Sequence, residues 1–125
     1  MKEVLHILTS NVLLIFPEAG RTSSDRANRL SGLPKGVEIR VPSTGVAQIV
    51  ARTNPTLLPI FIQRTDQFLG RGQGIPRFWK GVVRITIGEP YHVEQLSMKG
   101  MEREERKAAL QQTANEIMRR VGTLK

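Results

Sequence analysis

The residues best suited to chemistry lie at positions 16–23, with the sequence Phe-Pro-Glu-Ala-Gly-Arg-Thr-Ser. An apolar run at 12–15 precedes them and predicts a short buried strand. Segment 16–23 would then be the turn that follows this strand. Arg21 offers a planar fork of donors that matches a phosphate group, and Gly20 lets a ligand approach the backbone closely. Glu18 can hold Arg21 in place or bind a substrate hydroxyl. The segment predicts a substrate-binding turn, with a turn carrying a surface ion pair as the plain alternative.

Segment 16–23 resembles the Phe-Pro-Glu-Gly-Thr-Arg-Ser block of the glycerolipid acyltransferases, the family that includes 1-acylglycerol-3-phosphate acyltransferase. Ala19 stands where that block has Gly, and Gly20 stands where it has Thr, which leaves the identity of the acceptor open. The resemblance implies that the block binds the acceptor and that its arginine meets the glycerol phosphate. The positions that match the block are Phe16, Pro17, Glu18 and Arg21, with Ser23 where the family often has Ser. The implied substrate-binding residues are Glu18, Gly20, Arg21 and Ser23.

Two weaker similarities follow in the same order along the chain. A helix that opens at 45–47 and leads to a strand at 58–60 is similar to the family's helix before its Val-Pro-Val-type block. The Gly-Glu-Pro-Tyr sequence at 88–91 is similar to the Gly-Glu-Pro-Ile turn that follows a late strand in the family. The resemblance spans residues 8–92. The order of the blocks along the chain is more informative than either weak block alone.

The family's catalytic His-x4-Asp block is not present in this sequence. His6 and Asn11 imitate its spacing, but an amide carries no charge with which to orient and stabilise a cationic imidazole. We therefore expect no catalytic residue here and a chain that is inactive alone. His92 is expected to be a surface or turn residue, and two histidines without a carboxylate cluster predict no metal site.

The resemblance implies the C-terminal, acceptor-binding portion of a phospholipid or glycerol acyltransferase domain. The full reaction would move an acyl group from acyl-CoA or acyl-carrier protein to a hydroxyl of a lysophospholipid or glycerol phosphate. The thioester is a donor substrate, so no bound cofactor is implied. The implied partners are the acceptor, an anionic membrane surface and a missing N-terminal half of the domain. The implied location is cytoplasmic, peripheral to the membrane.

Length, composition and charge limit the classes of protein to which this chain can belong. The length of 125 residues predicts one domain over 1–125, and the absence of cysteine excludes disulfides and thiol chemistry. The net charge is +8, and two segments, 21–52 and 64–84, each hold a net +4. Such basic loops attract a phosphate ester, an anionic membrane or nucleic acid; a solvated basic surface is the plain alternative. No apolar run is long enough to span a bilayer.

The basic segments allow further interpretations. The glycine-rich stretch 70–74 lacks the Gly-Lys-Ser/Thr ending of a phosphate loop and is expected to be a flexible loop. Phe68, Phe78 and Trp79 suit either a lipid headgroup layer or core packing. A small nucleic-acid-binding module fits the charge, but aromatic residues form only 5% of the chain and no recognised motif is present. A non-catalytic lipid-surface protein is the third alternative.

The periodicity predicts an α/β chain, a partial αβα layer with a small mixed sheet flanked by helices. Its edge strand would need a partner, as expected of an incomplete acyltransferase domain. Ser43 or Thr44 is expected to cap the second helix. The predicted helices are 2–9, 46–53 and 102–121; the predicted strands are 12–16, an exposed one at 36–41, 57–62 with Pro59 at its start or on an unpaired side, and 82–87; and 65–80 is predicted to be a loop.

Overall fold

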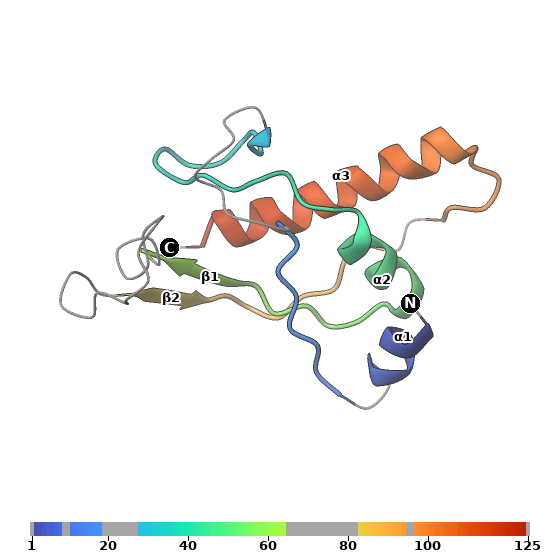
Figure 1. Ribbon diagram of the computed structural model, residues 1–125, viewed down its shortest axis with the longest axis horizontal. Helices are drawn as coiled ribbons and strands as arrows, with labels where there is room; N and C mark the ends of the chain where they lie inside the picture. The colour runs from blue at the N-terminus through green and yellow to red at the C-terminus, as the bar shows by residue number, and fades with distance from the viewer. Residues whose placement is uncertain (1, 9–10, 19–27, 65–82, 95–96, 125) are drawn as a thin grey trace, which may run out of the picture.

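The longest element, helix α3 (Arg103–Gly122), carries the apolar face on which the other elements pack (Figure 1). The computed structural model describes residues 2–8, 11–18, 28–64, 83–94 and 97–124. The buried side of α3 has the three-and-four spacing of an amphipathic helix, as the sequence predicts. The residues buried on α3 are Leu110, Thr113, Ala114, Ile117, Met118 and Gly122. The hydroxyl of Thr113 donates to the Ala109 carbonyl at 3.0 Å, so this buried polar group is satisfied.

Helix α2 (Gly45–Thr53) packs against the middle of α3 and forms the α2–α3 cluster with it. The predicted end of α2 is confirmed: Asn54 adopts the left-handed conformation and its N–H donates to the Val50 carbonyl at 2.9 Å. Thr44 is the N-cap, at one of the two predicted positions, but its side chain accepts no capping hydrogen bond, so that part of the prediction is wrong. Its φ of −72° and ψ of −7° are helical, whereas a capping side chain requires extended backbone. The buried members of the cluster are Val46, Ala47, Val50, Leu110, Ala114 and Ile117.

A second group of buried residues, the Met118 cluster, lies under the C-terminal half of α3. It consists of Leu30, Ile39 and Met118, with Leu33, Val37 and Phe61 packed against it. Residues 28–30 run antiparallel to 39–41, where the Leu30 N–H donates to the Ile39 carbonyl at 2.8 Å. The prediction of an exposed strand at 36–41 is therefore wrong. This segment makes an isolated bridge, and α3 covers its central residue Ile39, which is 2% exposed.

The described sheet consists of two antiparallel strands, β1 (Ile60–Gln63) and β2 (Arg84–Ile87). Pro59 lies just before β1, as predicted, and its carbonyl accepts from the Gly88 N–H at 2.9 Å. A bridge between Leu57 and Tyr91 extends the pairing. The described residues combine helices with a small sheet, as the α/β prediction expects, but the sheet is an antiparallel pair and not mixed. The loop predicted at 65–80 lies outside them.

Helix α1 (Lys2–Leu8) forms where predicted and contacts α2. Residues 12–16 are extended but form no ladder with the described strands, and Val12 is 96% exposed, so the predicted buried strand is wrong. An apolar run becomes a buried strand only when a neighbouring strand satisfies its backbone and a core covers its side chains. None of the described helices is both long and apolar enough to cross a bilayer.

The last turn of α3 approaches the Met118 cluster so closely that a side chain on Gly122 would have to displace its neighbours. A Cβ on Gly122 would lie 2.5 Å from Leu33 Cδ2 and 2.8 Å from Ile39 Cδ1, and the buried Ile39 has no room to retreat. We predict that Gly122→Ala lowers the free energy of unfolding by about 1–3 kcal/mol through overpacking, despite the higher helix propensity of alanine. Urea unfolding measures the change. The matched control is Gly45→Ala, where the nearest atom is 3.7 Å away; equal stability of the two variants would contradict the packing argument.

Tyr91, which is half-buried, lies beneath the Arg120 guanidinium, whose central carbon is 3.9 Å from the ring centroid. Burial raises the pKa of Tyr91 above its ordinary value, and the Arg120 charge opposes part of that increase. The folded state therefore favours the neutral phenol. The contribution of Tyr91 to the free energy of unfolding is complete below the pKa of the unfolded state, about 10. It is lost as the pH rises through the pKa of the folded state.

We predict that the chain loses stability above about pH 10 and that Tyr91→Phe removes part of that loss. Tyr91 is the single tyrosine of the sequence, so tyrosinate absorbance reports its titration directly. In Arg120→Ala the pKa of Tyr91 should rise further, because the favourable charge is gone. A fall of that pKa in Arg120→Ala, or identical alkaline stability losses in Tyr91→Phe and the parent chain, would contradict the assignment.

Candidate functional site

The described start of segment 16–23, residues 16–18, is held by two backbone donors that lie far away in the sequence. The Ser43 N–H donates to the Pro17 carbonyl at 3.0 Å. The Arg40 N–H donates to Glu18 Oε2 at 3.3 Å, in a half-buried position. Both donors belong to the segment 40–43, which leads into α2. The chain therefore enters the turn in a fixed position, and Glu18 contributes to holding it there.

Segment 40–43 is in turn held by α3. The Gln111 side-chain amide donates to the Pro42 carbonyl at 3.0 Å and to Asn115 Oδ1 at 3.0 Å. Pro42 is buried, so its carbonyl is satisfied by a protein donor in place of water. A continuous set of hydrogen bonds thus runs from the middle of α3, through the residues before α2, to the start of the turn.

Two arginines lie opposite each other beside this anchor. Arg29 and Arg40 form an antiparallel bridge, which brings their side chains to one face. Arg29 makes an ion pair with Glu38, although its buried Nε has no hydrogen-bond partner. Within the described part of the chain, Arg40 forms no ion pair. Its charge is therefore available to an anion near the turn.

The structure describes one of the four predicted substrate-binding residues. Glu18 has a partner in the Arg40 backbone, whereas Gly20, Arg21 and Ser23 lie outside the described residues. Sequence reasoning missed the anchoring residues Arg40, Ser43 and Gln111. They are separated from the atoms they bind by 22 residues for Arg40 and Glu18 and by 69 for Gln111 and Pro42, so no local pattern marks them.

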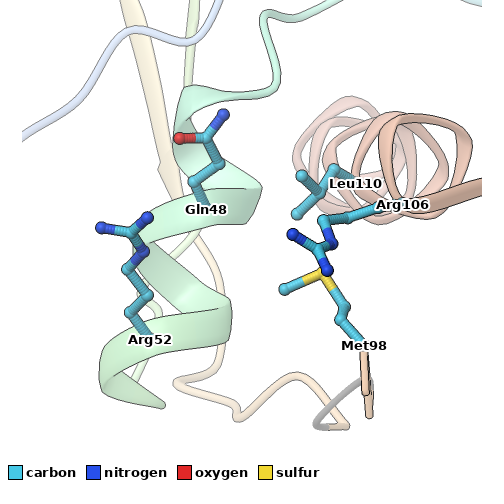
Figure 2. Close-up of a pocket in the computed structure, with 5 residues that line it drawn as sticks. All are labelled: Gln48, Arg52, Met98, Arg106 and Leu110. Atoms are coloured by element: carbon cyan, nitrogen blue, oxygen red, sulfur yellow. The ribbon is translucent and has the colours of Figure 1, made fainter. Parts of the chain in front are cut away.

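A pocket of about 250 Å³ lies between α2, α3 and the chain that leads into α3 (Figure 2). Arg52 and Arg106 line it together with the apolar side chains of Met98 and Leu110, and Gln48 completes the lining. Two guanidinium groups beside an apolar wall can accommodate a small anion with an apolar part. The volume lies below the roughly 300–1,000 Å³ of ordinary ligand pockets. None of its lining residues belongs to the turn or its anchors.

The two histidines lie apart from the turn anchors. His92 is exposed, as predicted, and its Nε2 lies 3.2 Å from the Thr56 hydroxyl oxygen. His6 lies on the exposed side of α1. Across the described ranges, no three His, Asp or Glu side chains are grouped so that they could hold a metal ion. Neither histidine shares a described hydrogen bond with the turn.

Comparisons with known proteins add no relative. No family model matches the sequence, and no curated protein or solved structure matches it significantly. The resemblance to glycerolipid acyltransferases therefore depends on the motif residues at 16–23, 45–60 and 88–91. The geometry around Glu18 bears on the first of these segments.

We predict that Glu18→Ala loosens the entry to the turn. The Arg40 N–H loses its described acceptor, which should cost about 0.5–1.5 kcal/mol and speed hydrogen exchange at the Arg40 amide. Nuclear magnetic resonance measures the hydrogen-exchange rate of the Arg40 amide separately from those of other amides. Glu89→Ala, which removes an exposed carboxylate, is the control. Unchanged exchange at Arg40 would show that the Glu18 carboxylate does not hold the turn.

Proposed function

We propose that this chain is the acceptor-binding portion of an acyltransferase. The acceptor is a glycerol phosphate or lysophospholipid, and the donor is acyl-CoA or acyl-carrier protein. The observation that carries the proposal is the double anchor on Pro17 and Glu18, because it fixes the backbone from which Arg21 follows three residues later in the sequence. A phosphate-binding arginine is useful only when the backbone that bears it is held in place.

The chemistry of the segment divides into two tasks. Arg21 supplies a bidentate donor pair for the phosphate, and Arg40 adds positive charge beside the anchored Glu18. Gly20 allows the phosphate to approach the backbone.

The acyl transfer itself needs a base that removes the hydroxyl proton as the oxygen attacks the thioester carbonyl and the thiol leaves. The sequence contains no His-x4-Asp block to supply that base, so the proposal assigns binding alone to this chain.

We predict that the chain binds sn-glycerol 3-phosphate and that Arg21→Ala weakens this binding about 10- to 150-fold, from a cost of about 1.5–3 kcal/mol for a charge-assisted hydrogen bond. Titration calorimetry measures the dissociation constant. The control is Arg103→Ala, which removes an exposed positive charge in the first turn of α3 and should leave binding unchanged. Glycerol, which lacks the phosphate, should not bind.

Two results would contradict the proposal. Equal weakening by Arg21→Ala and Arg103→Ala would mean that the anion responds to overall charge and not to a site. Thioester-dependent turnover by the purified chain, abolished by His6→Ala, would mean that His6 is catalytic and that the chain is more than a binding portion.

A further inference from the structure

The pocket beside α2 has an arginine on each of two opposite walls. On α2, Gln48 and Arg52 are four residues apart, and residues with this spacing share one side of a helix. On α3, Arg106 and Leu110 have the same spacing. Figure 2 shows the α2 side chains on one side of the pocket and those of α3 on the other, together with Met98. A ligand in this pocket would therefore lie between two guanidinium groups.

The polar side chains of the pocket are not neutralised by the protein. Across the described residues, Arg52 and Arg106 form no ion pair, and their side chains and that of Gln48 make no hydrogen bond. The described lining of the pocket contains no carboxylate. Two positive charges that border one small space repel each other. An anion between them would remove this repulsion and accept the free hydrogen-bond donors.

Side chains alone would supply the hydrogen bonds to such an anion. The backbone amides at the pocket are used within the helices. The Gln48 N–H donates to the Thr44 carbonyl at 3.0 Å, and the Arg106 N–H donates to the Glu102 carbonyl at 2.9 Å. Phosphate sites commonly use free backbone N–H groups at helix N-termini or in glycine-rich loops. A carboxylate needs fewer donors, and its two oxygens match the planar fork of a guanidinium group.

The remaining wall is apolar and continuous with the core. Leu110 is buried in the α2–α3 cluster, and Met98 packs against that cluster. A fully polar anion would leave this wall uncovered, whereas an anion with an aliphatic or aromatic body would bury it and gain affinity. The volume of about 250 Å³, below the roughly 300–1,000 Å³ of ordinary ligand pockets, restricts that body to a few carbon atoms.

We propose that this pocket binds a small organic acid, with its carboxylate between Arg52 and Arg106 and its apolar body against Met98 and Leu110. The Gln48 amide donates to the carboxylate from the α2 side. The site is separate from the proposed acceptor site, because none of its described lining residues belongs to segment 16–23 or to the anchors of that segment. The inference therefore does not depend on the proposed function.

The test is a titration of the full, nitrogen-15-labelled chain with sodium 3-methylbutanoate, followed by nuclear magnetic resonance at constant ionic strength so that screening stays equal. Saturable shifts are expected at the amides of Gln48, Arg52, Arg106 and Leu110. Arg52→Gln and Arg106→Gln should each weaken binding about tenfold, the lower end for a charge-assisted hydrogen bond, because both arginines are exposed to solvent. Arg84→Gln, which removes an exposed arginine of β2 outside the pocket, is the matched control and should bind like the parent.

Two further ligands separate the charged and apolar parts of the site. Acetate has the charge without the body, and 3-methylbutanol has the body without the charge. Each should bind about tenfold more weakly than 3-methylbutanoate, or worse. Met98→Gln should weaken the binding of 3-methylbutanoate and leave that of acetate unchanged, because acetate does not reach the apolar wall. Far-ultraviolet circular dichroism confirms that each variant keeps its helices.

Four outcomes would overturn the proposal. These are the absence of saturable shifts at the pocket amides, equal weakening by Arg84→Gln and Arg52→Gln, binding of 3-methylbutanol as tight as that of the carboxylate, and tighter binding of inorganic phosphate at the same amides. Arg52→Gln should leave the dissociation constant for sn-glycerol 3-phosphate unchanged. The pocket and the acceptor site can therefore fail separately.

Discussion

The close packing of α2 on α3 is the contact on which the rest of the described structure depends. Ala47 and Ala114 are completely buried in the α2–α3 cluster, and their small side chains let the two helices approach each other. This contact fixes the residues before α2 relative to the middle of α3. Gln111 can then reach the Pro42 carbonyl, and the backbone on either side of Pro42 can hold Pro17 and Glu18. The geometry of the candidate site is thus a consequence of helix packing.

The same helix organises the opposite end of the molecule. The C-terminal half of α3 covers the Met118 cluster, into which Phe61 of β1 projects from one side of the sheet. Because β1 alternates, burying Phe61 toward α3 sends Ile60 and Ile62 to the other side. Ile62, Ile85 and Ile87 are therefore exposed on the side of the sheet opposite the core. Their exposure follows from a two-stranded sheet that has a helix on one side.

The sequence by itself determined the helices and their ends. The three-and-four spacing from Leu110 to Met118 predicts the buried side of α3, and Asn54 before a proline predicts the end of α2, because both depend on contacts within a few residues. Tertiary structure alone decided which apolar segments are buried. The runs at 12–16 and 36–41 both suggest strands, yet Val12 is exposed and Ile39 is enclosed, because only Ile39 lies beneath α3. The anchors Arg40, Ser43 and Gln111 likewise had no local signal. Their hydrogen bonds join positions far apart in the chain, and such pairs exist only once the helices have packed.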